Sequence, residues 1–522
     1  MPSPDRRTFM KTMGSGSIGL VLTGTGARSG QAPSIHSSDR TGGSRPNILF
    51  AISDDHSWPH TGAYGCKAIA TPAFDRVAEE GALFHNFFCA APQCSPNRAA
   101  ILTGRHIGQL EEAGTHASNF PTKFRVYTDL LEETGYQVGF TGKGWGPGNW
   151  EFNRRTRNPA GPEFSQIQLN ERPSKAIRNL DYAANFQSFF KKRDRSKPFC
   201  FWYGSSEPHR IYETGSGAQS GKRLEDVKVP PFLPDIPEVR SDILDYFLEI
   251  EWFDRHLERM LELLEKSGEL DNTIVVVTGD NGMPFPGAKA NLFEYGTHVP
   301  MAVRWPERIR SRLQINSLVS SVDLAPTYLE AAGLEVPAQF SGRSILDLFG
   351  SKELTREFVI SGRERHSHSR PDNLGYPSRA IRTPDYLLIR NFKPDRWPMG
   401  DPTGSGEPYG FHDIDNSPTK SLLLEKKEDP EYRVFYQQAF EKRPEIELYA
   451  IRRDPGCMEN LAGKQEFASV ERELAALLDH NLRKQQDPRA FGFEIFESYP
   501  RYSRMRAFPG FKEEGRYNFA YQ

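Results

Sequence analysis

The sequence predicts an α/β fold with a parallel sheet, followed by a smaller α+β domain. Short, continuous apolar runs are typical of strands buried on both faces of a parallel sheet. Four such runs occur, at residues 47–52, 137–141, 198–203 and 273–277. Helical segments lie between and after them, most clearly over 239–266 and more briefly over 71–81 and 321–333. We interpret the charged residues between the apolar positions of 239–266 as a solvated face.

The sequence pattern changes near residues 350–355. Shorter strand-like pieces and one helix follow, at 358–360, 386–390, 447–449 and 470–482. We therefore predict a first domain over 46–352 and a smaller α+β domain over 353–522. Aromatic residues are frequent from Phe491 to Phe511. We interpret this stretch as a tail packed on its own domain rather than as a segment that binds a partner.

The first residues resemble an export signal. Arg6 and Arg7 are followed by Phe9, Lys11 and a short apolar stretch over 18–22. This combination is typical of a twin-arginine signal, which we place at residues 1–33, with a disordered linker over 34–45. We therefore expect a bacterial protein that is periplasmic or secreted. The alternative is a basic disordered tail.

The composition of the 522 residues excludes several classes of protein. A net charge of −2 gives no general attraction to nucleic acid or to an acidic membrane. No apolar run approaches the roughly 20 residues that cross a bilayer. Five cysteines in an exported chain do not indicate a disulfide framework, and their pairing and the oligomeric state stay open.

Acidic and amide side chains follow two of the predicted strands. Asp54 and Asp55 come after the first strand, and Asp280 and Asn281 come after the strand at 273–277. Open α/β sheets place their sites at the carboxyl ends of their strands. Three carboxylates and one amide oxygen suit a hard cation such as calcium. Either acid pair alone could instead be a solvated turn or a helix cap.

Cys94 lies in a segment that points to a nucleophile. The run Cys94-Ser-Pro-Asn-Arg98 is followed by Leu102-Thr-Gly-Arg105. Arg98 would lie about one helical turn beyond Cys94, where a cation can hold neighbouring acids in place. The alternatives are an inert buried cysteine and a surface salt bridge. The run matches the C-x-P-x-R…L-T-G-R signature, and the chain therefore resembles the type I sulfatases.

This resemblance implies a chemistry for Cys94. In type I sulfatases a maturation enzyme oxidises the cysteine to formylglycine, whose hydrated aldehyde is the nucleophile and re-forms when sulfate is expelled. The resemblance also implies an alkaline-phosphatase-like mixed sheet flanked by helices. It implies calcium bound by Asp54, Asp55, Asp280, Asn281 and the modified Cys94. It also implies that the chain is an enzyme that acts on a sulfated glycan.

Further site residues follow from the same resemblance. Lys143 and Lys289 would bind sulfate oxygens, and His209 would contact sulfate or protonate the leaving atom. An isolated lysine is otherwise a solvated surface charge. The chain departs from the family at Trp145, where many sulfatases have a histidine that acts as a base. His116 is a candidate substitute.

Within the family, the chain is most similar to the N-sulfoglucosamine sulfohydrolases. The stretches that carry this similarity include 207–210, 229–234, 280–286 and 376–379. Lys289 and Trp145 replace an arginine and a histidine of that group.

The smaller domain could supply substrate specificity. His366 and His368 would lie on one face of a strand, and Arg379 could meet a uronate carboxylate. A solvated loop is the alternative for the two histidines, and ordinary surface charge is the alternative for the arginine.

Three other functions remain open. The chain could be an O-sulfatase acting on an algal or mucosal polysaccharide. It could hydrolyse phosphoesters or phosphonates, because the fold and metal site suit either tetrahedral anion. It could also be an inactive protein that binds sulfated glycans, with Cys94 left as a thiol.

Overall fold

The computed structural model describes residues 45–350, 356–403 and 410–501. Its main sheet has the strand order β4-β5-β1-β6-β7-β2-β8. The strands are β1 (Asn47–Ser53), β2 (Ala82–Phe84), β4 (Gln137–Gly142), β5 (Phe199–Gly204), β6 (Thr273–Gly279), β7 (Met301–Arg304) and β8 (Leu313–Ile315). The four predicted strands are β4, β5, β1 and β6, which are adjacent and parallel. Since β7 runs antiparallel to β6 and β2, the sheet is mixed, as the resemblance implied.

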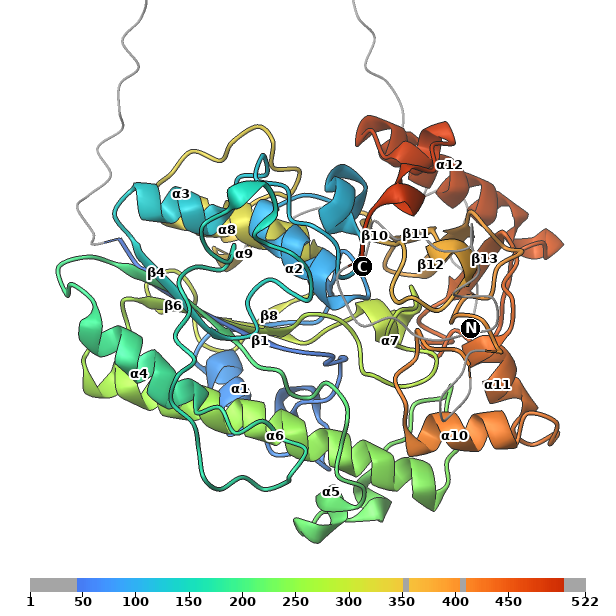
Figure 1. Ribbon diagram of the computed structural model, residues 1–522, viewed down its shortest axis with the longest axis horizontal. Coiled ribbons are helices and arrows are strands. Elements are labelled where there is room, and N and C mark those ends of the chain that lie inside the picture. The colour runs from blue at the N-terminus through green and yellow to red at the C-terminus, as the bar shows by residue number, and fades with distance from the viewer. Residues whose placement is uncertain (1–44, 351–355, 404–409, 502–522) are drawn as a thin grey trace, which may run out of the picture. The chain divides into compact units, whose positions relative to one another are not determined.

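Helices cover both faces of this sheet (Figure 1). On one face, an apolar cluster joins the strands to α1 (Pro72–Glu79), α4 (Tyr182–Lys192) and α6 (Pro237–Lys266). On the other face, a second cluster joins them to α2 (Cys94–Thr103), α3 (Tyr127–Glu133) and α8 (Leu324–Ala331). The predicted helices at 71–81, 239–266 and 321–333 are confirmed as α1, α6 and a 3-10 turn (Ser321–Asp323) that leads into α8. Shorter elements are α5 (Ser216–Gln219), α7 (Glu294–Thr297), α9 (Leu346–Phe349) and the paired strands β3 (Phe87–Phe88) and β9 (Val319–Ser320).

The middle of α6 is not the amphipathic surface helix that its periodicity indicates. Residues 242–250 are all buried, including the acidic side chains of Asp242, Asp245 and Glu249. Helix α5 packs on this part of α6, as does α10 (Pro418–Glu425). The prediction of a solvated acidic face is therefore wrong for these three residues.

The C-terminal region has a separate antiparallel sheet of order β10-β11-β12-β13. Its strands are β10 (Val359–Arg363), β11 (Ser378–Arg382), β12 (Tyr386–Asn391) and β13 (Ile446–Ala450). Helix α12 (Ala468–Lys484) packs on it through leucines, and α11 (Arg433–Phe440) lies nearby (Figure 1). Three strands and α12 were predicted. The sequence of β11, Ser-Arg-Ala-Ile-Arg, hides its strand character because both arginines are buried in ion pairs rather than exposed.

Part of the aromatic tail is described. Phe496 is buried, and the carbonyl groups of Tyr499 and Pro500 accept hydrogen bonds from Arg365, so this segment packs on its own region as expected. Phe491 and Phe493 are exposed. The expected export signal, the linker up to residue 44 and the aromatic residues beyond 501 lie outside the described residues. Among the helices that are described, none is long and apolar enough to cross a membrane, and all five cysteines are free.

Candidate active site

The acidic residues predicted as metal ligands meet at the carboxyl ends of β1 and β6. These strands pair in parallel with Ser53 opposite Gly279, so the residues that follow each strand lie side by side. The backbone N–H of Asp55 donates a hydrogen bond to Oδ1 of Asp280 at 3.0 Å. Asp54, Asp55, Asp280 and Asn281 are all buried. The sequence argument from strand ends thus places these four side chains together as expected.

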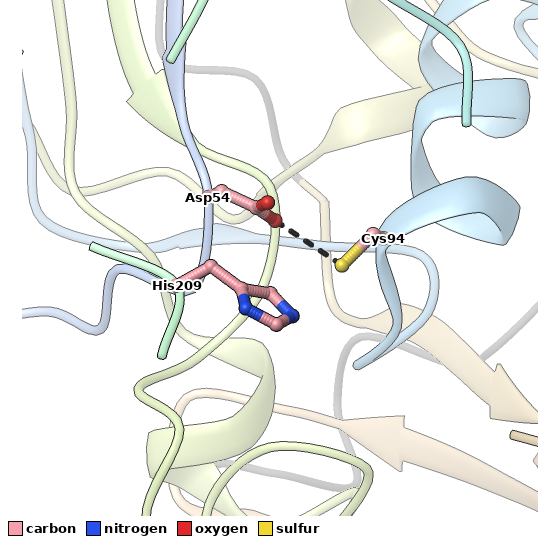
Figure 2. Close-up of side chains that lie close together, drawn as sticks. All are labelled: Asp54, Cys94 and His209. Carbon is pink, nitrogen blue, oxygen red and sulfur yellow. Dashed lines mark hydrogen bonds between the residues drawn. The ribbon is translucent and has the colours of Figure 1, made fainter. Parts of the chain in front are cut away.

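Cys94 faces this acidic group from the first residue of α2. Its Sγ donates to Oδ1 of Asp54 at 3.1 Å and lies 3.9 Å from Oδ1 of Asp55 (Figure 2). The possible ligand atoms of Asp54, Asp55, Cys94 and Asp280 all lie within 4.8 Å of one another. Burial, followed by the charge of Asp54, raises the pKa of the Cys94 thiol well above its usual value. An unmodified Cys94 is therefore a poor nucleophile, because the thiolate is the reactive form.

Glycine and packing fix α2 in place. All ten residues of the helix are buried, and it ends at Gly104, whose φ of 61° is left-handed. A Cβ at Gly104 would lie 2.4 Å from a ring atom of Phe340, so a larger residue fits neither the backbone nor the space.

Three cations each pair with one of the three carboxylates. Nε of Arg98 donates to Asp280 at 2.8 Å. Nζ of Lys143 donates to Asp54 at 2.5 Å, and Nζ of Lys289 donates to Asp55 at 2.7 Å. The structure therefore brings together the three predicted cations and the three predicted acids, with formal charges that balance.

The electrostatics of the acids reflect this pairing. Burial alone would raise the pKa of Asp54, but Lys143 and the other nearby cations hold it well below its usual range. For Asp280, burial and the charge of Asp54 outweigh the attraction of Arg98 and raise the pKa to about 6. Three carboxylates so close together favour an additional cation, because each raises the cost of ionising its neighbours.

Lys143 is held by a tight contact between β4 and β5. Gly142 has a φ of 76°, and a Cβ at Gly204 would lie 1.9 Å from the carbonyl oxygen of Lys143. That oxygen also accepts hydrogen bonds from Arg98 and from the indole of Trp202. Two glycines thus allow the strand ends to approach closely enough to aim the Lys143 side chain at Asp54.

The residues present fit a calcium ion. Oδ1 of Asn281 is buried and has no hydrogen-bond partner in the described part of the chain, while its Nδ2 donates to Asp55 at 2.8 Å. The two ends of an amide side chain are assigned from their partners, and a cation would be met by the oxygen. With Asp54, Asp55 and Asp280, Asn281 completes a set of oxygen donors without nitrogen, which is what calcium prefers.

His209 follows β5 and lies beside the nucleophile position. Its ring is near Asp54 and Cys94 (Figure 2), and its Nε2 lies 3.8 Å from Oδ2 of Asp55. Its Nδ1 donates to the carbonyl oxygen of Arg210 at 2.6 Å, because a carbonyl can only accept. This hydrogen bond fixes the ring and leaves Nε2 to meet a ligand.

Trp145 has a packing role in the structure. The indole is buried, packs edge-on against Phe120 and donates to the carbonyl oxygen of Ser95 at 3.0 Å. His116 lines the same cavity as Cys94, and Ala117 donates its backbone N–H to the Ser95 hydroxyl. His116 is therefore anchored next to the start of α2, as the sequence alone could not show.

The orientation of His116 leaves one ring nitrogen able to accept a proton. Its Nδ1 donates to the carbonyl oxygen of His366 at 2.9 Å, so Nε2 carries the lone pair. Burial, with the neighbouring His366 and Arg501 next, lowers the pKa of His116 well below its usual value. The imidazole is accordingly neutral near pH 7.

Asp415 belongs to the site and was not predicted. Its Oδ2 accepts a hydrogen bond from Nζ of Lys289 at 2.8 Å, and it groups with Asp55 and His209 within 4.8 Å. Asp415 lies in a loop of the C-terminal region, more than 100 residues after Lys289 in the chain. No local pattern marks it, because the contact is made only by tertiary packing.

The predicted substrate-binding residues of the C-terminal region are placed differently from the expectation. Strand β10 ends at Arg363, so His366 and His368 lie in a loop rather than on one strand face. Both histidines are buried, so the loop is not solvated either. Arg379 is buried, pairs with Asp487 at 2.6 Å and does not line the main cavity. These placements correct the strand prediction and give no support to substrate contact by Arg379.

A cavity of about 460 Å³ opens beside the nucleophile position. Its walls come from the loops after β4 and β5, from segment 158–178 and from α6. The predicted residues Asp54, Cys94, Lys143 and His209 line it. The volume is within the range of about 300–1,000 Å³ that is usual for small-molecule sites.

Residues 46–334 match the sulfatase family, and residues 288–429 match a family described as N-sulphoglucosamine sulphohydrolase, C-terminal. The first match covers more than half of the chain, which therefore belongs to the sulfatase family. The resemblance inferred from the Cys94 motif is confirmed, and the chain is a hydrolase of sulfuric esters or sulfamates.

Curated relatives have several names. The human N-sulphoglucosamine sulphohydrolase is 28% identical over 84% of this chain and 89% of its own length. An N-acetylglucosamine-6-O-sulfatase of Bacteroides thetaiotaomicron is 25% identical over 85% of this chain and 87% of its own. An ulvan-active sulfatase of Formosa agariphila is 25% identical over 83% of this chain and 74% of its own.

Solved structures share the fold. A protein in complex with its substrate D-glucosamine-2-N,6-O-disulfate matches with a TM-score of 0.61 at 22% identity, covering 85% of this chain and 99% of that chain. A 2-O GAG sulfatase matches with a TM-score of 0.60 at 20% identity, covering 85% of this chain and 94% of that chain. At these identities the likeness establishes the fold alone, and it agrees with the predicted α/β class.

Proposed function

We propose that the protein removes the sulfate from N-sulfated glucosamine, with a formylglycine derived from Cys94 and a calcium ion. The observation that carries the proposal is the position of Cys94, whose side chain lies within 4.8 Å of the carboxylates of Asp54, Asp55 and Asp280. The C-terminal match to N-sulphoglucosamine sulphohydrolase supports the choice of the N-sulfate.

The two groups would supply complementary chemistry. Calcium, bound by Asp54, Asp55, Asp280 and Asn281, would stabilise negative charge on the sulfate oxygens. Formylglycine would supply a hydroxyl nucleophile where the buried thiol of Cys94 is unreactive.

The chain's own residues orient the sulfate and handle protons. Lys143 and Lys289 place ammonium groups next to Asp54 and Asp55 and would bind sulfate oxygens. A protonated Nε2 of His209 would donate to the leaving nitrogen. Nε2 of His116 would accept a proton in the role that other sulfatases give to the histidine at the position of Trp145.

The role of His116 has a test of its own. His116→Gln should lower kcat by about 100-fold with little change in KM, since general base catalysis contributes roughly 10²–10⁴-fold. The control is His480→Gln on α12, outside the cavity. The acid limb of the pH–rate profile, which reports the general base, should change for His116→Gln alone, and an unchanged profile would refute the assignment.

A 6-O-sulfated sugar is the second candidate substrate, because a relative over 85% of the chain is an N-acetylglucosamine-6-O-sulfatase. The deciding experiment measures sulfate release from glucosamine carrying either the N-sulfate or the 6-O-sulfate alone. Preference for the N-sulfate supports the proposal. Preference for the 6-O-sulfate means that the differences at Trp145 and Lys289 have changed the substrate.

We also propose export by the twin-arginine route, on the basis of Arg6 and Arg7. Replacing both arginines by lysine should keep the protein in the cytoplasm, and fractionation of the bacterial cell would show this. Unchanged export would contradict the assignment.

A further inference from the structure

Four acidic side chains of α6 are buried, and three of them have partners. Asp242 forms two hydrogen bonds with the guanidinium of Arg210. Asp245 accepts the backbone N–H groups of Gly215 and Gly217. Asp254 accepts those of Ala73 and Phe74 at the start of α1.

Glu249 is the fourth and differs from the others. It is 2% exposed, and its Oε1 has no hydrogen-bond partner among the described residues. Buried polar groups in folded proteins are almost always paired, and an unpaired one costs about 1–3 kcal/mol. Glu249 also lines the substrate cavity, together with Cys94 and His209. A ligand in the cavity could therefore supply the missing partner.

The residues around Glu249 have other hydrogen-bond partners. The guanidinium of Arg210 donates to both oxygens of Asp242 and to the carbonyl oxygen of Pro284. Two other buried acids line the cavity: Glu207 accepts hydrogen bonds from Tyr182 and Ser205, and Asp54 accepts one from Lys143. Among the buried acids that line the cavity, Glu249 is thus the one with an unpaired buried oxygen.

The charge around Glu249 indicates the kind of ligand group. Burial, and next the charge of Glu207, raise the pKa of Glu249 well above its usual value, which favours the neutral carboxyl. A neutral carboxyl both donates and accepts, as a sugar hydroxyl does. The charges that act on it are those of Glu207, Arg210 and Asp245, not those of the groups around Cys94. The cations near Cys94 would bind the sulfate, so Glu249 would meet an uncharged part of the sugar.

We propose that Glu249 is a specificity-determining residue of the substrate cavity and binds a hydroxyl group of the sugar that carries the sulfate. The inference rests on the proposed function and adds to it how the unsulfated part of the sugar is recognised. It predicts that the enzyme discriminates between sugars that differ at one hydroxyl.

The test combines enzyme variants with substrate analogues. N-sulfoglucosamine and its 3-, 4- and 6-deoxy analogues are compared with the wild type, Glu249→Met and Glu249→Gln. With the wild type, one deoxy analogue should lose about 10- to 100-fold in kcat/KM. Glu249→Met should show a similar loss with the parent sugar and no further loss with that analogue. Glu249→Gln keeps a hydrogen-bonding group and should lose less than Glu249→Met.

Two further measurements separate recognition from structure. The control is Glu258→Met, an exposed position of the same helix outside the cavity, which should leave kcat/KM unchanged. Glu249→Met should not lower the free energy of unfolding, because the carboxyl has no partner in the protein for Oε1. A clear loss of stability in Glu249→Met would overturn the inference, as would equal losses of every analogue in the wild type and Glu249→Met.

Failure of the proposed function would be seen with the wild-type enzyme, and so can be distinguished from failure of the Glu249 inference. If the wild type releases sulfate only from the 6-O-sulfated sugar, the N-sulfate assignment fails and the same comparison is made with the 3- and 4-deoxy forms of that sugar. If the wild type releases sulfate from neither sugar, the proposed function and this inference both fall.

Discussion

The ion pair of Lys289 and Asp415 connects the region of the main sheet with the C-terminal region at the active site. Nζ of Lys289 lies 2.8 Å from Oδ2 of Asp415 and 2.7 Å from Oδ2 of Asp55, so one ammonium group bridges two carboxylates. Burial alone would raise the pKa of Asp415, but Lys289 holds it well below its usual value. The C-terminal region therefore helps to position a cation that the proposed reaction needs.

Asp415→Asn should lower kcat/KM by about 10- to 100-fold, because small displacements of a positioning group have effects of this size. The measurement is steady-state kinetics with the sulfated sugar, and Asp395→Asn, an exposed position, is the control. Lys289→Met should cost more than Asp415→Asn, and the double variant should be no worse than Lys289→Met. Additive losses would show that Asp415 acts independently of Lys289.

Cys94→Ala should reduce sulfate release to background and change the free energy of unfolding by less than about 1 kcal/mol. The reason is that the thiol is small and, among the described residues, forms only weak hydrogen bonds, to Asp54 at 3.1 Å and to Asp55 at 3.9 Å. Sulfate release and thermal unfolding are the two measurements. Cys200→Ala removes an equally buried thiol from β5 and should keep full activity. Retained turnover in Cys94→Ala would refute its assignment as the source of the nucleophile.

Asp280→Asn should lose bound calcium and activity together. The substitution keeps the size of the side chain but removes one of the three charges that attract the ion. Metal content of the purified protein, measured by elemental mass spectrometry, is the direct readout. Asp271→Asn alters an exposed acid and should leave the calcium content as in the wild type. Equal calcium in both variants would exclude Asp280 as a ligand.

The pair of Glu294 and Arg382 predicts a dependence of stability on pH. Burial alone would raise the pKa of Glu294, but Arg382 and His298 outweigh it and lower the pKa to about 2. The unfolded value is about 4.3, so the pair contributes about 3 kcal/mol of stability above that pH. The folded state binds fewer protons than the unfolded state between these values, so this contribution is lost as the pH falls from about 4.3 towards 2.

Glu294→Gln should accordingly unfold more easily than the wild type at pH 7, and the difference should shrink below pH 4. Denaturant titrations at several pH values measure it. The exposed pair of Glu265 and Arg76 provides the control, because Glu265→Gln should change stability by less than about 1 kcal/mol at any pH. A difference for Glu294→Gln that is the same at pH 3 and pH 7 would contradict the pKa assignment.

The sequence predicted those parts of the site that depend on local order along the chain. Asp54, Asp55, Asp280 and Asn281 follow buried parallel strands, and parallel strands deliver their ends to one edge of the sheet. Arg98 was placed by the helical spacing from Cys94. These predictions needed only periodicity and strand order.

Other residues depend on long-range packing that periodicity does not report. Asp415 meets Lys289 only because a loop of the C-terminal region reaches the main sheet. The sequence gives only a weak indication that Glu249 is buried, because it falls between Tyr246 and Phe253 on the apolar side of its helix. The prediction that His366 and His368 lie on a strand was wrong, because β10 ends at Arg363.

The burial of α2 also bears on when Cys94 could be oxidised. Cys94 is 1% exposed, and no residue of its helix reaches the surface. A maturation enzyme that oxidises this residue would have to act on the nascent or unfolded chain, before β1, β6 and α2 assemble. A protein that folded first would be fixed as the thiol form, so the fraction of active enzyme would be set by competition between folding and oxidation in the producing cell.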